Sequence, residues 1–299
     1  MAFRNIVISN ACTLSVHNNQ LLISRDKQIS SIPIEDICTV VIDNSLSSIT
    51  SYALAQLSAF GVSVFLCNGE HLPQSVLIPF NTFSRQLKMT QEQFSLSKSF
   101  KDGIWKQIVA AKINNQAKCL ELCGIEGAEA LKQLAKNVQS GDKTNMEAVA
   151  AAKYFKLLFG DSFTRRQDNV YNACLNYGYS IFRGTIARTL AASGLEPCLG
   201  IHHRNELNNF NLADDLIEPF RPIIDLFVML NVSSEDTLTS ELKYRLIGLL
   251  SVNVLLGAEN QSASYAIERM VQSYSACVQK KQKDILVPQL TDLRLHQYE

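Results

Sequence analysis

Thr13-Leu14-Ser15-Val16 alternates polar and apolar residues, and the strand-like Leu21-Leu22-Ile23-Ser24 lies on the other side of the polar centre His17-Asn18-Asn19-Gln20. Alternation with a period of two is typical of a half-buried strand, and two strand-like runs around a short polar turn predict a β-hairpin. Three further strand-like runs and one short helical pattern follow: Ile37–Asp43, Ser48–Phe60, Val62–Leu66 and Val76–Pro79. We therefore expect a small β-rich N-terminal domain over residues 1–80.

A change of period marks the second part of the chain. Residues 81–87 read as a linker, and beyond them apolar residues recur at the spacing of one helix face, beginning with Ile104, Trp105, Ile108, Val109 and Ile113. A chain of 299 residues also exceeds the size at which a single core keeps growing. The expected fold class is α+β, with a larger all-α-helical catalytic domain over residues 88–299 that ends in a lysine-rich polar tail.

Composition excludes several classes of protein. No apolar run approaches the roughly 20 residues of a membrane-spanning helix, and the N-terminus lacks a signal-peptide pattern, so we expect a cytoplasmic protein. The eight cysteines form no CxxC pair and are expected to be reduced. Sequence motifs for nucleotide phosphates, acyl transfer and helical zinc sites are absent. Because the net charge is zero, any DNA binding has to come from a local basic surface.

Glu147 opens a predicted helix over residues 147–159. Thr144-x-x-Glu147 is the pattern of a capping box, in which the glutamate satisfies a backbone N–H at the helix start. The alternative is a metal-ligand carboxylate, on a helix whose next turn of small residues lets a nucleic-acid backbone approach. Both interpretations remain open on these residues alone.

Asp215 and Glu218 form a second acidic segment. Spacing of i,i+3 on one helix would place both carboxylates on the same face, where their repulsion calls for a compensating cation. Pro219 disfavours helical geometry at Glu218, which predicts a helix boundary or kink there. The alternative is a solvated acidic face with Arg221 as the i,i+3 partner of Glu218.

Further candidates are basic or imidazole side chains. Arg165 and Arg166 precede an N-capped helix start and suit phosphate contacts, although solvated surface arginines fit equally well. His17, in the predicted hairpin turn, is either a stacking wedge at a duplex end or an exposed turn residue. His202 and His203 are adjacent candidates for one ligand position. Two carboxylates and an imidazole are an oxygen-dominated set that suits Mg²⁺ or Mn²⁺ phosphoryl chemistry.

Set in order, four blocks of sequence resemble the universal CRISPR-associated spacer-acquisition integrase family. The first two blocks are Glu147, Ala150, Ala151, Tyr154 and Phe155, then Arg165, Arg166, Asp168, Asn172, Ala173, Leu175, Asn176, Tyr177, Gly178 and Tyr179. The last two are Gly194, Leu195, Pro197, Gly200 and His203, then Asp215, Leu216, Glu218, Pro219, Phe220, Arg221, Pro222 and Asp225. In its compact size and in the Glu218-Pro219-Phe220-Arg221-Pro222 sequence of the last block, the chain resembles the family members found in type II systems.

The resemblance implies a metal-dependent DNA integrase and endonuclease. Its motif positions make Glu147, His203 and Glu218 the ligands of Mg²⁺ or Mn²⁺, and Asp215 an auxiliary carboxylate that supports the site or faces DNA. Arg165, Arg166, Arg221 and His17 are the candidate DNA contacts. In the implied reaction, each prespacer 3′-hydroxyl attacks a phosphodiester of the CRISPR repeat.

The resemblance also implies partners. Double-stranded prespacer and repeat DNA are the expected substrates, and the N-terminal domain is expected to dimerise and contact DNA. Two homodimers would flank a dimer of a small ferredoxin-like CRISPR protein in a heterohexamer, with the type II effector nuclease as a further partner. Two alternatives stay open: a structure-specific or branch-resolving nuclease that uses the same site with water, and a catalytically silent DNA-binding scaffold in which Glu147 only caps its helix.

Overall fold

The computed structural model describes residues 4–79, 83–280 and 282–297. The chain divides into two compact units, residues 1–81 with 297–299 and residues 82–296. The predicted linker covers residues 81–87, of which 81 and 82 lie outside the described residues. Helix α2 (Gln86–Phe94) begins at the next-to-last residue of that predicted linker.

The N-terminal unit contains two four-stranded sheets. The first has the order β1 (Arg4–Ile8), β5 (Ile37–Ile42), β7 (Ser63–Cys67) and β8 (Pro73–Val76), and only its β7–β8 pairing is antiparallel. The second has the order β4 (Gln28–Pro33), β3 (Gln20–Arg25), β2 (Thr13–His17) and β6 (Ser48–Ile49), and helix α1 (Ser51–Ala59) follows it in the chain. The expected β-rich N-terminal domain is confirmed. Strands β1, β4 and β6 were not predicted, and the strand expected at Val76–Pro79 lies earlier, as β8.

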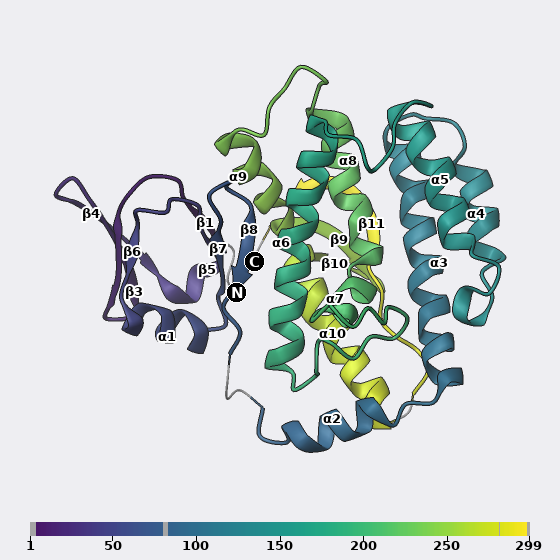
Figure 1. Cartoon of the computed structure of the whole chain (residues 1–299), viewed down its shortest axis with the longest axis horizontal. Helices are drawn as coiled ribbons and strands as arrows, with labels where there is room; N and C mark the ends of the chain where they lie inside the picture. Colours follow the sequence, from purple (N-terminus) through teal and green to yellow (C-terminus); the bar gives the residue numbers. More distant parts are fainter. Residues whose placement is uncertain (1–3, 80–82, 281, 298–299) are drawn as a thin grey trace. The chain divides into compact units, whose positions relative to one another are not determined.

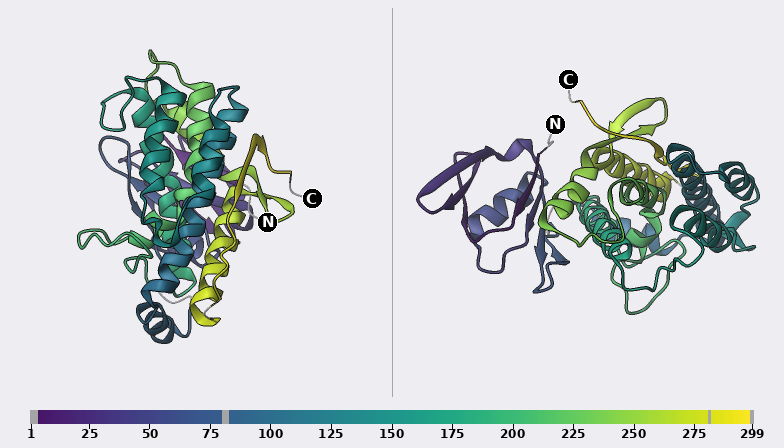
Figure 2. Two further views of the ribbon diagram at one scale, coloured as in Figure 1. Left: turned by 90° about the vertical axis from the view of Figure 1, so that its right-hand side faces the viewer. Right: turned by 90° about the horizontal axis from the view of Figure 1, so that it is seen from above.

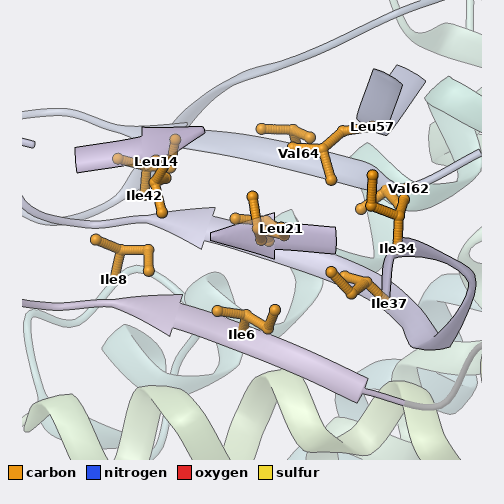
Figure 3. Packing of buried hydrophobic residues seen from close by; sticks show 11 residues of the cluster. Ile6, Ile8, Leu14, Leu21, Ile34, Ile37, Ile42, Leu57, Val62 and Val64 are labelled. Carbon is orange, nitrogen blue, oxygen red and sulfur yellow. The ribbon is translucent and has the colours of Figure 1, made fainter. Parts of the chain in front are cut away.

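The predicted hairpin is formed by β2 and β3. His17 pairs with Gln20, and the turn between them consists of Asn18 and Asn19, whose φ angles are 48° and 56°. Two consecutive positive φ angles fit the tight turns that match the twist of a hairpin, and asparagine tolerates them better than most residues. Leu14 and Leu21 of this hairpin are fully buried in the core shown in Figure 3.

The second unit is mainly helical (Figure 1). Its remaining α-helices are α3 (Lys98–Leu122), α4 (Ala128–Lys136), α5 (Met146–Phe159), α6 (Val170–Ala192), α7 (Asn211–Leu216), α8 (Arg221–Asn231), α9 (Ser240–Gly248) and α10 (Ala263–Lys280). Short 3-10 turns are η2 (Ser140–Asp142), η3 (Glu218–Phe220) and η4 (Leu249–Ser251).

Helix α3 is the central element of this unit. The apolar residues that predicted it, from Ile104 to Ile113, are buried, and α3 contacts α4, α5 and α8 together with η2 and η3. Helices α6 and α8 also pack closely, because a Cβ at Gly178 would lie 2.6 Å from a methyl carbon of Ile224. The long α3 helix therefore passes the starts of α5 and α8, where the candidate carboxylates lie.

The expected larger helical domain is confirmed, but it is not helical throughout. A three-stranded antiparallel sheet has the order β10 (Glu259–Ser262), β9 (Val252–Leu256) and β11 (Gln289–Leu295), and β9 and β10 contact α10 (Figure 2). Strand β11 comes from the segment that was predicted as a polar tail. Strand β10 has four polar residues, and the three leucines of β11 are interspersed with polar residues and only one of them is buried, so neither strand left a clear apolar pattern in the sequence.

Two further features agree with the sequence patterns. All eight cysteines are free thiols. Among residues 4–79, 83–280 and 282–297, no helix combines the length and apolar character that crossing a membrane requires.

Candidate functional site

Two of the predicted ligands meet at one lysine. Glu147 at the start of α5 lies 2.7 Å from the Lys112 Nζ atom, and Glu218 in η3 lies 2.5 Å from the same atom. The side chains of Lys112 and Glu218 are only 10% and 5% exposed. Three elements that are distant in sequence thus place two carboxylates on a single buried cationic group.

Asp142, rather than Thr144, caps the start of α5. Its carboxylate oxygens accept hydrogen bonds from the backbone N–H groups of Met146 and Glu147, at 2.8 and 2.9 Å. The capping-box interpretation of Glu147 is therefore wrong, because Asp142 satisfies these orphan donors and the Glu147 side chain contacts Lys112 instead. The Glu147 carboxylate is therefore not used for capping α5 and can bind a cation.

This difference predicts a stability effect. Asp142→Ala should lower the free energy of unfolding by roughly 1–3 kcal/mol, since two partly buried N–H groups lose a charged acceptor. Thr144→Ala, the matched control, should change it by less than about 0.5 kcal/mol because Thr144 is exposed. Urea unfolding of both variants measures these changes. A larger loss of stability for Thr144→Ala would support the capping-box interpretation.

Glu218 sits at the boundary between α7 and α8, as Pro219 predicted. Its Oε1 atom accepts a hydrogen bond of 2.9 Å from Arg221, the expected i,i+3 partner. Its buried Oε2 atom makes the charge contact with Lys112 without a hydrogen bond of normal geometry. Since Glu218 is buried, the alternative of a solvated acidic face is wrong, although its Arg221 pairing is present.

The charges around Glu218 fix its ionisation. Burial alone would raise the pKa of Glu218, but Arg221 and Lys112 lower it to about 2. Burial likewise opposes the charged form of Lys112, and the carboxylates of Glu218 and Glu147 raise the pKa of this ammonium. At neutral pH Glu218 is therefore ionised and requires positive charge close by.

Asp215 organises the loop that carries the histidines. Its fully buried carboxylate accepts backbone hydrogen bonds from Ile201, His202 and His203, at 2.5, 3.0 and 3.1 Å. A Cβ at Gly200 would lie 2.3 Å from the His203 carbonyl oxygen and 3.0 Å from Asp215, so the loop requires glycine there. Asp215 thus supports the site, and its predicted alternative role facing DNA is excluded by burial.

The same carboxylate orients His203. The Nδ1 atom of His203 lies 2.7 Å from Asp215 Oδ1, and this hydrogen bond raises the pKa of the His203 imidazole. When the neutral imidazole donates from Nδ1, its Nε2 atom carries the lone pair that can bind a metal. Histidines that bind metals are commonly held in this way by a carboxylate on the other nitrogen.

His202 has a different environment. Its ring stacks on Trp105, with centroids 4.4 Å apart and planes 3° apart, whereas His203 meets Trp105 edge-on. The two adjacent histidines are therefore distinguished by their contacts. His203 is the one coupled to Asp215.

We expect this difference to appear in activity. His202→Ala should retain measurable strand joining and lose about 0.5–1.5 kcal/mol of stability from the lost ring stacking. His203→Ala should reduce joining by at least about a hundredfold, because removing a ligand should cost at least as much as disturbing a residue that orients one. A strand-joining assay of both variants distinguishes the two histidines. Loss of joining in His202→Ala but not in His203→Ala would show that the ligand is His202.

Of the predicted DNA contacts, two arginines interact with other side chains of the protein, and two residues are exposed to solvent. Arg165 donates hydrogen bonds to Asn172 and Asn176, and its guanidinium lies 5.3 Å from the Tyr179 ring centroid. Arg221 pairs with Glu218 and lies over the same ring. The exposed candidates are Arg166 and His17. For all four, a role in binding DNA stays a prediction.

A buried network behind the site joins three helices. Asp225 of α8 accepts hydrogen bonds from Tyr154 of α5 and Tyr179 of α6. Burial raises the pKa of Asp225 to about 6, against the opposing effect of these tyrosine donors. The network fixes α5 and α8, which carry Glu147 and border Glu218.

Sequence reasoning missed Lys112 and Asp142. Lys112 follows Trp105 by seven residues and Ile108 by four, so it occupies the buried stripe of α3. A lysine on an apolar helix face was the available signal for a buried ion pair. Asp142 lies before the predicted helix start, and only its folded position brings it to the N–H groups of α5.

The donor set fits a hard divalent cation. Glu147 and Glu218 already converge on one cationic group, and His203 presents a nitrogen oriented by Asp215. Among the residues that the structure describes, no group of three or more His, Cys, Asp or Glu side chains lies close enough together to hold a metal ion. A metal bound by all three predicted ligands would therefore require a local rearrangement around Lys112.

Comparisons with known proteins agree with the sequence motifs. The family model described as CRISPR associated protein Cas1 matches residues 6–245. The chain is 39% identical over 305 residues to the CRISPR-associated endonuclease Cas1 of Neisseria meningitidis serogroup C (strain 8013), with 100% of each covered.

Two solved structures share the fold. A casposase bound to an integration product is 20% identical with a TM-score of 0.73, covering 95% of this chain and 92% of its own. A Cas6-RT-Cas1–Cas2 complex is 18% identical with a TM-score of 0.67, covering 94% of this chain and 35% of its own.

Proposed function

The chain belongs to the CRISPR-associated Cas1 family, and on this premise we propose that it is a divalent-metal-dependent DNA integrase and endonuclease. It would join the 3′-hydroxyls of prespacer DNA to phosphodiesters of the CRISPR repeat. The observation that carries the proposal is the convergence of Glu147 and Glu218 on one cationic group, together with the orientation of His203 by Asp215.

Each polar residue of the site has a distinct task in this reaction. Glu147, Glu218 and the Nε2 atom of His203 would hold Mg²⁺ or Mn²⁺, which polarises the scissile phosphate and lowers the pKa of the attacking hydroxyl. Asp215 keeps His203 in the ligating tautomer. Arg221 keeps Glu218 ionised and fixed in place. Because one phosphodiester replaces another, the reaction needs no ATP.

Two structural neighbours support the proposed partners. One structural neighbour is a casposase bound to an integration product, and another is a complex that contains Cas1 and Cas2. We infer double-stranded DNA as the substrate, and a heterohexamer of two homodimers around a small Cas2-like dimer. The type II subtype, the effector nuclease as a partner and the cytoplasmic location stay predictions.

A second candidate function is cleavage of branched or structured DNA with water as the nucleophile. The name of the Neisseria relative, an endonuclease, favours it, and the same residues would serve both reactions. The scaffold alternative has less support, because Asp142 caps α5 and Glu147 is not needed for that purpose.

Joining of a prespacer to a supercoiled plasmid that carries a CRISPR repeat tests the proposal. The intact chain, with and without a Cas2 protein, should form joined products with Mn²⁺ or Mg²⁺ and none in EDTA. Cleavage of forked DNA without joining would favour the nuclease alternative. Metal-independent binding and bending of DNA, with no product under any condition, would favour the scaffold.

Metal choice and pH give a quantitative expectation. Mn²⁺ accepts a nitrogen ligand more readily than Mg²⁺, so it should support joining at lower concentration. The hydrogen bond from His203 to Asp215 raises the imidazole pKa above its ordinary value of about 6.5, and the protonated ring cannot bind metal. The half-saturating Mn²⁺ concentration should therefore rise as pH falls through that raised pKa. Equal half-saturation by both metals, without a pH effect, would argue against a histidine ligand.

A further inference from the structure

Lys112 occupies the position in which the two candidate carboxylates share a positive charge. We propose that Lys112 is a built-in counter-cation of the Glu147–Glu218 pair, and that a divalent metal ion binds by displacing its ammonium from between them. The inference rests on the proposed metal-dependent function. It adds a residue that controls how tightly the site binds metal.

The contacts of Lys112 are those of a bridging cation. Its Nζ atom lies 2.7 Å from Glu147 Oε1 and 2.5 Å from Glu218 Oε2, and these carboxylates come from separate elements, α5 and η3. The lysine stem lies on the buried face of α3, and its side chain is 10% exposed. Buried charges persist when they are paired, so each of these three groups depends on the others.

The local charges balance without a metal ion. Two carboxylates, Glu147 and Glu218, face two cations, Lys112 and Arg221, so their formal charges sum to zero. A divalent ion added to this cluster would leave an excess of two positive charges at close range. Removing the ammonium from contact lowers that repulsion, and the metal then replaces it as the counter-charge.

Distances also favour displacement over sharing. Carboxylate oxygens bind Mg²⁺ at about 2.0–2.1 Å, closer than they approach an ammonium nitrogen. A metal between Glu147 and Glu218 would therefore take the space that Lys112 Nζ occupies. Lysine can withdraw on its flexible four-carbon stem, whereas the planar guanidinium of Arg221 is held over the Tyr179 ring, 4.5 Å from its centroid.

Binding of Mn²⁺ alone to the intact chain tests the proposal independently of activity. Calorimetry should show that Lys112→Met binds Mn²⁺ at least about tenfold more tightly than the wild type, because a competing cation is gone. Lys112→Arg retains the charge and should not bind more tightly than the wild type. The matched control is Lys118→Met on the same helix, where the ammonium pairs with Glu121 near the surface, and it should leave Mn²⁺ affinity unchanged.

Thermal unfolding gives a second measurement. In EDTA, Lys112→Met should unfold at a lower temperature than the wild type, because Glu147 loses its partner and Glu218 loses one of two. Saturating Mn²⁺ should raise the unfolding temperature of Lys112→Met more than that of the wild type. A variant that folds only with Mn²⁺ supports the proposal. If Lys112→Met stays unfolded even with Mn²⁺, Lys112→Gln takes its place in the same binding comparison.

The outcomes separate this inference from the proposed function. Unchanged Mn²⁺ affinity in Lys112→Met, together with weaker binding in Glu147→Ala, would overturn the role of Lys112 and leave the metal site intact. Mn²⁺ binding that is insensitive to Glu147→Ala in both the wild-type and Lys112→Met backgrounds would overturn the metal site itself, and the Lys112 proposal with it.

Discussion

Glu147→Ala is expected to reduce metal-dependent strand joining by at least about a thousandfold, while affinity for duplex DNA changes by no more than a few-fold. The loss follows from removing a carboxylate that would hold the metal at the reacting phosphate. Affinity should persist because most of it comes from phosphate contacts elsewhere on the protein. Joining rates and duplex affinity, measured on the same preparation, check both parts.

The fold of this variant should be nearly intact. Asp142 still caps α5, and Lys112 keeps its contact with Glu218, so the variant should fold with a stability loss of roughly 1–3 kcal/mol for the lost charged hydrogen bond between Lys112 and Glu147. Glu121→Ala is the matched control, because it removes another lysine-paired glutamate far from the histidine loop, one that pairs with Lys118 and Lys132. If Glu147→Ala lost DNA binding and stability in proportion to activity, its role would be structural.

The fold was predictable where the signal was local. The β2–β3 hairpin could be predicted from the residue pattern within each strand. Its Asn18-Asn19 turn has the backbone geometry that asparagine favours. The buried stripe of α3 was equally visible. Strands β9 and β11 were missed because they pair over a long sequence separation, and β11 has only one fully buried residue, Leu290. Strands of this kind, with few buried side chains, are decided by tertiary contacts rather than by periodicity.

The sequence named the candidate ligands, whose role stays a prediction, and one counter-charge, Arg221, but it gave no sign of Lys112. Motif resemblance selected Glu147, His203 and Glu218, and Pro219 correctly placed Glu218 at a helix boundary. A cation beside the acidic segment was also expected on grounds of repulsion. Its identity as Lys112 depends on the packing of α3 against α5 and η3, which no local pattern encodes.

Asp215→Asn is expected to lower the free energy of unfolding by roughly 2–4 kcal/mol and to weaken Mn²⁺ binding by about 10–100-fold. The wild-type carboxylate accepts hydrogen bonds from three backbone N–H groups and contacts His203 Nδ1, all from one loop. Asparagine has the same shape but a single acceptor oxygen, so its amide group would oppose buried N–H donors. The loop from Ile201 to His203 should lose its fixed conformation.

The tautomer of His203 provides the sharpest readout of this effect. In the wild type, nitrogen NMR should report the proton on Nδ1, whereas Asp215→Asn should show a mixture of tautomers and a lower imidazole pKa, since the carboxylate that raises it is gone. Asp214→Asn is the matched control, because this neighbouring carboxylate is 19% exposed and pairs with Arg183 instead. It should leave the His203 tautomer and Mn²⁺ affinity unchanged. If Asp214→Asn destabilised the protein as much as Asp215→Asn, the loop would depend on general negative charge rather than on the four contacts of Asp215.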